Sequence, residues 1–357
     1  MNLGEFVNIE EEFFKRGYLL SPEAKKLLEN RNWKDYLNKN YERMVLMPDD
    51  FADEIRILKN LTYIPERLTT DIFLKFQNSK YDKMKKIFIE RIGNEFVSIN
   101  KIGRRGHVSV IGIVRNIKEK EGKKIIEIED ITGLATVIYK GEENVALDDV
   151  IGVRGTSAGN VIYADEILFP GVPIRSPTTG KGKICIISGL DLDESPTDKV
   201  EKLIKFLQTE EYDYLIVIGN IGDVGAFENF NITKKIIVIP GPKDSKTYPS
   251  IPLKFSKENI ISLSNPSMIE INGVKILLIN NFNMNMLKKR YLGKSSIILN
   301  EDYLVLDILP DIIVSNGKPS VSNYKSITII NSGTLLDVMK PVVVNLETRD
   351  WKEIEGF

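Results

Sequence analysis

The donor atoms of this chain limit the chemistry that it could perform. Its 357 residues include a single histidine, His107, and a single cysteine, Cys185. Zinc, manganese and iron centres that hydrolyse esters use imidazole ligands, because a neutral nitrogen suits these borderline metals. The oxygen donors that follow apolar runs of sequence are Asp191, Asn220, Asp223, Asp244 and Asn280. These carboxylates and amides could hold a lone hydrated Mg²⁺, but not a bridged pair of ions.

Apolar segments in the second half of the chain predict buried strands that would position these donors. The segments are KICIISGL, YLIVIGN, KIIVIPG, KILLINN, DIIVSNG and ITIINSG. Residues 197–209, between the first two, have the apolar spacing of an amphipathic helix. Strands that alternate with turns and helices predict an α/β layered domain over residues 173–357, with its site along the C-terminal ends of the strands.

The first part of the chain is expected to be helical. Residues 1–47 are predicted to form a helical region, in which Ser21 caps a helix that begins at Pro22. Residues 48–97 are predicted to hold a linker and then a helix over 70–92, because apolar residues recur there at helical spacing. This part therefore differs from the strand-rich remainder.

Residues 98–172 change to an alternation of apolar and polar positions. The segments HVSVIGIVRNI, KIIEIEDITGLATVIYK, ALDDVIGVRGT and NVIYADEILFP have the pattern of short strands, with a charged hairpin at 118–124. Short strands with glycine-marked bends predict a small β-barrel of the oligonucleotide-binding (OB) type. The predicted fold class is therefore a multidomain α+β protein with a helical N-terminal region, a barrel and an α/β sandwich.

The composition, with 42% hydrophobic and 28% charged residues, is that of a folded protein. The formal net charge of −1 supplies no global field that would attract nucleic acid. No apolar run is long enough for a membrane span, and the acidic start of the chain is unlike a signal peptide, so we expect a cytoplasmic protein. Cys185 excludes an internal disulfide and is expected to be a buried, unreactive strand residue.

Contacts with nucleic acid are expected to be weak. Single-strand binding by an OB barrel needs stacking aromatics within a basic groove, and this barrel offers only Tyr139 and Tyr163. His107, at the first barrel strand, is expected to be a surface or packed residue. Two basic clusters could make weak phosphate contacts. They comprise Arg104 and Arg105 before the first strand, and Lys288, Lys289 and Arg290 in the C-terminal domain.

The order of motifs along the chain resembles that of the small (B) subunits of DNA polymerases, in particular the archaeal family D small subunit. The motifs are VSVIGIVRNIKEKEGKKIIEIEDITG, LDDVIGVRGT, ADEILFPGVP, Asn265-Pro266, LKKRYL, LPDII and INSGT. The resemblance covers residues 10–30 and 75–350. It implies a helical N-terminal part, an OB barrel and a calcineurin-like phosphoesterase domain, which in active members resembles a two-metal 3′–5′ exonuclease.

The same resemblance implies that the metal centre of this family has been lost here. Where the family has Asp-x-His, this chain has Gly189 and Asp191, and Asn220 stands in place of the bridging aspartate. The other positions that lack their family ligand are Pro242, Lys243, Asn280, Gly317 and Pro319. Asp223 and Asp244 are retained at positions that look structural in the family, and we expect them to bind backbone groups. Lys243 brings a positive charge to the place where a cation would sit.

The expected function is that of a non-catalytic accessory subunit, without metal or cofactor, which binds the catalytic (large) subunit of a DNA polymerase. The resemblance implies that the barrel and the phosphoesterase-like domain hold that partner together. Two alternatives stay open. One is an exonuclease or phosphoesterase with a metal-poor site on Asp191, Asp223 and Asp244. The other is a stand-alone OB-type nucleic-acid-binding protein that uses Arg104 and Arg105.

Overall fold

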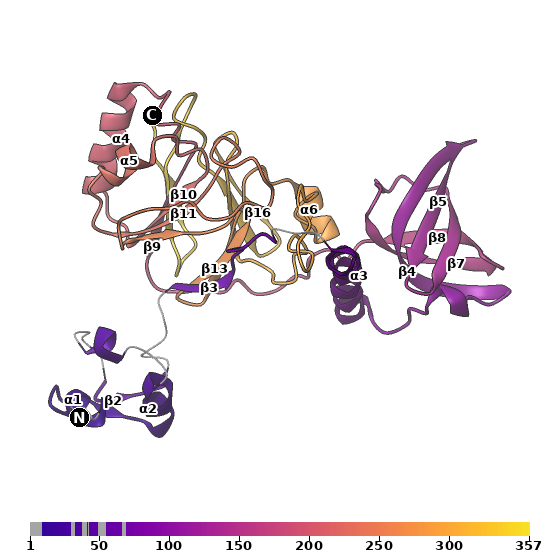
Figure 1. Cartoon of the computed structure of the whole chain (residues 1–357), viewed down its shortest axis with the longest axis horizontal. Helices are drawn as coiled ribbons and strands as arrows, with labels where there is room; N and C mark the ends of the chain where they lie inside the picture. Colours follow the sequence, from indigo (N-terminus) through magenta and orange to yellow (C-terminus); the bar gives the residue numbers. More distant parts are fainter. Residues whose placement is uncertain (1–8, 30–32, 38–40, 42, 49–54, 66–68) are drawn as a thin grey trace. The chain divides into compact units, whose positions relative to one another are not determined.

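The computed structural model describes residues 9–29, 33–37, 41, 43–48, 55–65 and 69–357 (Figure 1). Parts of the predicted helical region and of the predicted linker therefore lie outside the described residues. The chain divides into two compact units, Met1–Arg56 and Ile57–Phe357. The first unit holds most of the region that was predicted to be helical, and the second holds the barrel and both large sheets.

The first unit contains the short helices α1 (Ile9–Phe14) and α2 (Pro22–Glu29) and a 3₁₀ turn at Trp33–Tyr36. Ser21 Oγ accepts a hydrogen bond of 3.1 Å from Ala24 N, which confirms the predicted N-cap. Besides these helices, the unit holds two short strands that were not predicted, β1 (Leu19–Leu20) and β2 (Val45–Leu46), which pair in parallel. Two-residue strands carry no periodic signal in a sequence.

The described strands of the second unit include two six-stranded sheets. The first has the order β12-β11-β10-β9-β18-β19, with β9 to β12 parallel. The second has the order β16-β17-β15-β14-β13-β3. The strands of the first sheet are β9 (Lys183–Ser188), β10 (Tyr214–Ile218), β11 (Lys235–Ile239), β12 (Ile260–Ser262), β18 (Val342–Asn345) and β19 (Trp351–Glu353). Those of the second are β3 (Ile55–Lys59), β13 (Ser267–Ile271), β14 (Val274–Leu278), β15 (Ile312–Ser315), β16 (Ser320–Tyr324) and β17 (Ile327–Asn331).

Each apolar segment that was predicted to be a buried strand is a strand, and the predicted mixture of α and β elements is confirmed. The helix predicted over 197–209 is α4 (Thr197–Thr209), which buries Leu203 and Leu207 against the first sheet. The shorter helices of this region are α5 (Val224–Glu228) and α6 (Met284–Lys289). No described helix of the chain is long and apolar enough to cross a membrane.

The helix predicted over 70–92 is α3 (Thr70–Ile92), and Thr69 caps it by accepting a hydrogen bond from Ile72 N. The buried face of α3 packs against the barrel formed by residues 105–168 and against the two-sheet sandwich. One hydrophobic cluster includes residues of all three. The cluster contains Tyr81, Met84, Ile87, Phe88, Ile111, Ile113, Val150 and Val305. Figure 1 shows α3 between the barrel and the sheets.

Residues 105–168 form a closed barrel in the order β4-β5-β6-β8-β7. Its strands are β4 (Arg105–Lys120), β5 (Lys123–Asp130), β6 (Gly133–Tyr139), β7 (Val150–Ala158) and β8 (Val161–Leu168). The β6–β8 pair is parallel and the other pairs are antiparallel. Alternate side chains fill the interior because successive residues of a strand point to opposite faces.

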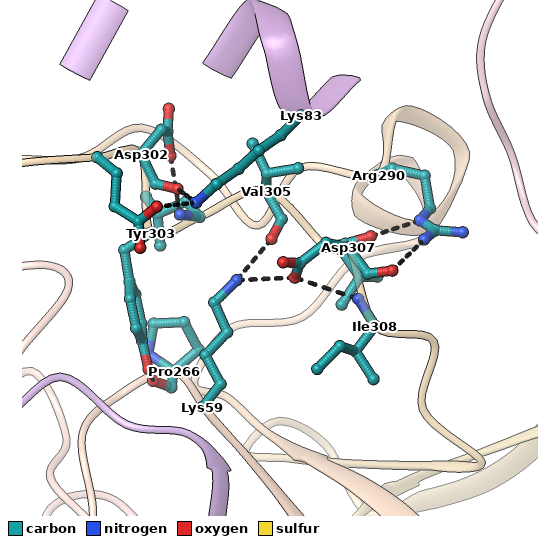
Figure 2. Close-up of polar contacts among 12 residues, drawn as sticks. Lys59, Lys83, Pro266, Arg290, Asp302, Tyr303, Val305, Asp307 and Ile308 are labelled. Carbon is teal, nitrogen blue, oxygen red and sulfur yellow. Dashed lines mark hydrogen bonds and ion pairs between the residues drawn. The ribbon is translucent and has the colours of Figure 1, made fainter. Parts of the chain in front are cut away.

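The basic cluster at 288–290 takes part in the packing of this unit, and its prediction as a phosphate contact was wrong for Arg290, whereas for the part-exposed Lys288 it stays a prediction. Arg290 is only 4% exposed and donates hydrogen bonds to the carbonyls of Leu306 and Asp307, as Figure 2 shows. Burial lowers its pKa to about 10. Lys288 Nζ lies 2.5 Å from a carboxylate oxygen of Glu143, and Lys289 is paired with an aspartate of the barrel.

The segment before α3 is also fixed to the sandwich. Lys59, on β3, donates a hydrogen bond of 2.8 Å to the carbonyl of Val305 and one of 3.0 Å to Asp307 Oδ1 (Figure 2). Lys83, on α3, donates one of 2.9 Å to the carbonyl of Asp302. Part of the predicted linker is therefore an edge strand of the second sheet.

Candidate site at the ends of the parallel strands

The loops that follow β9, β10 and β11 meet at one edge of the first sheet, because these parallel strands run side by side in register. Asp191 N donates a hydrogen bond of 2.7 Å to the carbonyl of Asn220. Lys243 N donates one of 3.1 Å to Asn220 Oδ1. The structure thus brings together three of the predicted site residues, Asp191, Asn220 and Lys243.

A lysine occupies the centre of this group. Nζ of Lys243 lies 2.8 Å from Oδ1 of Asp191 and 2.8 Å from Oε2 of Glu194. Two hydrogen bonds raise the pKa of Lys243 above its usual value; the one to Asp191 has the larger effect and the one to Glu194 the smaller. Asp191 is only 2% exposed, so its carboxylate depends on this partner.

Glu194 is a site residue that the sequence interpretation missed. It lies on the same loop as Asp191, in the acidic stretch Asp191-Leu192-Asp193-Glu194. That acidic stretch was the available signal. Only the three-dimensional contact shows that Lys243 is shared between the two carboxylates.

The two retained aspartates bind backbone groups, as expected. Asp244 accepts hydrogen bonds from the amides of Ile221, Gly222 and Gly241, and so fixes the turn after β10. Asp223 caps α5 by accepting a hydrogen bond of 3.0 Å from Ala226 N. Their oxygens are therefore used in local structure.

Asn280, at the end of β14, reaches across to the first sheet. Its Nδ2 donates a hydrogen bond of 2.7 Å to the carbonyl of Pro240, and its Oδ1 lies against Gly219. A Cβ added at Gly219 would lie 2.4 Å from that oxygen, and the φ of Gly219 is +58°. The amide of Asn280 thus holds two sheet ends together.

The predicted positions Gly189, Gly317, Pro319 and Pro242 lie in the turns around this edge. The amide of Gly189 donates to the carbonyl of Ile218. Gly317 and Pro319 belong to the turn between β15 and β16, where Pro319 packs near Gly333. Pro242 lines a cavity of about 390 Å³ that begins beside Asn280.

The donors at this edge do not fit a pair of divalent cations. Such a centre needs a bridging carboxylate and several further ligands that face the ions. Here the carboxylates of Asp191 and Glu194 are bound to an ammonium group, and those of Asp223 and Asp244 bind backbone amides. His107 lies on β4 of the barrel. Within the described part of the chain, no group of three or more His, Cys, Asp and Glu is arranged to hold a metal ion.

The basic residues before the first barrel strand are exposed. Arg104 and Arg105 lie at the surface, and Arg105 lines a cavity of about 540 Å³ together with Lys101 and His107. Arg154 also lines this cavity and binds Glu95 and Glu166, so the lining has both signs of charge. Of the two tyrosines considered for stacking, Tyr163 is exposed and Tyr139 is buried.

A larger depression, which we call the α3 depression, lies between α3, the barrel and α6 with the segment that follows it. Its volume is about 550 Å³, and its lining includes Phe73, Leu147 and Met286. The 390 Å³ cavity beside Pro242 shares Met286, Gly293, Lys294 and Ser296 with it. The two hollows are therefore neighbours, one beside the strand ends and the other beside the barrel.

The described residues define a mixed α/β protein in which a closed barrel, a long helix and a two-sheet sandwich form one unit. Comparison with curated proteins then gives a closer likeness: the chain is similar to archaeal DNA polymerase II small subunits. It is 26% identical over 347 residues to that of Methanothermobacter thermautotrophicus, and the match covers 73% of this chain and 72% of the relative. It is 25% identical over 342 residues to that of Archaeoglobus fulgidus, with 73% and 70% covered. No family model matches the chain.

Among solved structures, similar chains match about half of this one. An archaeal phosphodiesterase is 16% identical, with a TM-score of 0.36, and the match covers 49% of this chain and 99% of that chain. Vps29 of Chaetomium thermophilum is 12% identical, with a TM-score of 0.32, and the match covers 48% of this chain and 84% of that chain.

Proposed function

We propose that this chain is a non-catalytic accessory subunit of a replicative DNA polymerase, which binds the catalytic subunit and acts in DNA replication inside the cell. The observation that carries the proposal is the similarity to archaeal DNA polymerase II small subunits over about three quarters of the chain. A small subunit acts within a complex, so the implied partner is the large subunit of a polymerase.

The architecture supports this assignment. The barrel is of the OB type, which is supported by its closure and by its Greek-key order, in which β6 pairs with β8. The sandwich is a calcineurin-like phosphoesterase domain that has lost its metal ligands. The polar residues at the ends of parallel strands, where α/β domains place their sites, support that part of the proposal.

The sandwich does not hydrolyse phosphate esters. The support is chemical: Lys243 holds the carboxylates of Asp191 and Glu194, and the other aspartates bind backbone amides. Purified protein incubated with Mn²⁺ and labelled single-stranded DNA should release no nucleotides. Release that disappears in an Asp191→Ala variant would instead establish the exonuclease alternative.

The α3 depression is the surface that we assign to the catalytic subunit. Its wall includes Leu147, which is 61% exposed, and Phe73, also exposed, whereas the unit keeps most of its large apolar side chains inside. Exposed apolar side chains that line a hollow between structural elements are typical of protein-binding surfaces. The depression touches both the barrel and the sandwich, so one partner could bind both.

Affinity purification from the native cell tests the function and the surface separately. The wild-type chain should recover a DNA polymerase large subunit, identified by its peptides. Leu147→Asp should weaken that recovery, whereas Leu134→Asp, at an exposed barrel leucine outside the depression, should not. Recovery that is equal for both variants would rule out the surface but leave the function intact. A wild-type chain that recovers no polymerase subunit would contradict the function itself.

A further inference from the structure

We propose that Lys243 is a built-in replacement for a bound metal ion, and that removing its ammonium group uncovers a weak divalent-cation site. The donors at the strand ends do not fit a metal pair while the lysine is in place, yet two carboxylates still converge on one point. This inference concerns the stability and ion binding of the sandwich, and it does not rest on the polymerase partner.

Lys243 connects the loops that follow three strands, two through its ion pairs and the third through its backbone amide. Lys243 follows β11, Asp191 and Glu194 follow β9, and β10 lies between these strands in the sheet. The Nζ atom lies 2.8 Å from one oxygen of each carboxylate, and the backbone amide of Lys243 binds Asn220 Oδ1 after β10. One residue thus ties all three loops together, as a metal ion bound at this edge would.

The two carboxylates differ in how much they need the lysine. The side chain of Asp191 is almost fully buried, whereas that of Glu194 is half exposed and can be solvated. A buried carboxylate without a partner is costly, because the interior cannot replace its hydration. The Asp191 contact is therefore the one that stabilises the folded chain.

The backbone at this edge also requires support. Asp191 and Asn220 have φ values of +43° and +44°, in the left-handed region that non-glycine residues seldom adopt. Such conformations persist where surrounding contacts hold them. Lys243 binds both residues, one through its ammonium group and one through its backbone amide.

Loss of the ammonium group leaves two carboxylates facing the space that it filled. A divalent cation prefers oxygen ligands at about 2.0–2.6 Å, so a small inward movement of Asp191 and Glu194 would bind one ion, with waters completing its shell. The site would be weak, because the protein supplies only two charged ligands. It would hold one ion and not a bridged pair.

The test compares the thermal unfolding midpoint of four variants in EDTA, Mg²⁺, Ca²⁺ and Mn²⁺, with calorimetric titration of Mn²⁺. Lys243→Met removes the charge and keeps an unbranched side chain that is one atom shorter, and Lys243→Arg keeps the charge. Lys246→Met is the matched control, because Lys246 is exposed on the same turn. Lys243→Met combined with Asp191→Asn removes the charges of both the lysine and its buried partner.

For the wild type, Lys243→Arg and Lys246→Met, we expect that the unfolding midpoint of each protein does not change between EDTA and any of the metals. Lys243→Met should unfold at a lower temperature in EDTA and recover part of the loss in Mn²⁺ or Ca²⁺. The double variant should unfold at a higher temperature than Lys243→Met, and its midpoint should be the same with and without metal. Both expectations for the double variant also hold where Lys243→Met does not fold in EDTA. A metal response in the wild type, none in folded Lys243→Met, or a double variant that also fails to fold would each overturn the proposal.

Discussion

Nζ of Lys289, at the end of α6, lies 2.6 Å from Oδ2 of Asp149 in the loop before β7, and both side chains are largely buried. The pair connects the sandwich to the barrel. Next to it, Lys288 pairs with Glu143 at 2.5 Å, but these side chains are far more exposed. Neighbouring lysines of one short helix therefore make ion pairs in different surroundings.

This difference predicts unequal effects on stability. Lys289→Ala should lower the free energy of unfolding by about 3 kcal/mol, because it leaves the Asp149 carboxylate buried without its partner. Lys288→Ala should cost about 0–1 kcal/mol, as exposed ion pairs do. Urea unfolding of both variants measures the difference. If the two variants lost the same free energy of unfolding, burial would not determine how much the Lys289–Asp149 pair stabilises the fold.

Gly219 is predicted to tolerate no side chain. Gly219→Ala places a methyl group 2.4 Å from Asn280 Oδ1 and adds strain, because φ is +58°. We expect a loss of about 3 kcal/mol or more in unfolding free energy. Gly122→Ala, in the β4–β5 hairpin, is the control: its φ is +68° but nothing lies within 4 Å of the added Cβ. Gly122→Ala should cost about 1 kcal/mol, from backbone strain alone. If Gly219→Ala cost no more than this, the clash with Asn280 would be excluded as a cause.

Nucleic-acid binding is predicted to be weak and to depend on the exposed Arg104 and Arg105 at the start of β4. Arg104→Ala combined with Arg105→Ala should weaken the binding of single-stranded oligonucleotides at low salt. It should also reduce the slope of log affinity against log salt by about 1–2, since each phosphate contact contributes about one unit. Fluorescence anisotropy measures both quantities. Lys288→Ala is the control, because that lysine is bound to Glu143 and should leave the slope unchanged.

The helices and the buried strands could be predicted because their signals are local. The helix over 70–92 repeats its apolar residues along several turns, and the central strands are runs of β-branched residues. β3 escaped prediction because its sequence, IRILK, mixes charged and apolar residues over only five positions. An edge strand of this kind is specified by the neighbouring sheet and not by its own pattern.

The site was predictable only in part, because side-chain contacts depend on the order of strands in the sheet. The sequence placed Asp191, Asn220 and Lys243 after strands, but it did not indicate that Lys243 would bind Asp191 across β10. Arg290 shows the opposite error. A cationic residue in a basic run was taken for a surface group, whereas two backbone carbonyls hold it in the interior.

Cys185 is predicted to report unfolding and to make stability depend on pH. The thiol is fully buried on β9, and burial raises its pKa, so the folded chain keeps it neutral. The unfolded chain ionises this thiol above about pH 8.5. Because the pKa of the thiol is higher in the folded chain than in the unfolded chain, its contribution to stability is complete below about pH 8.5. That contribution is lost as the pH rises further. In urea unfolding, the free energy of unfolding of the wild type should therefore decline between pH 7 and pH 10. The decline should be smaller in Cys185→Ala, when each protein is compared with its own free energy of unfolding at pH 7. A thiol reagent should modify the wild type only at the rate of unfolding, and immediate modification of the folded protein would contradict the burial of Cys185.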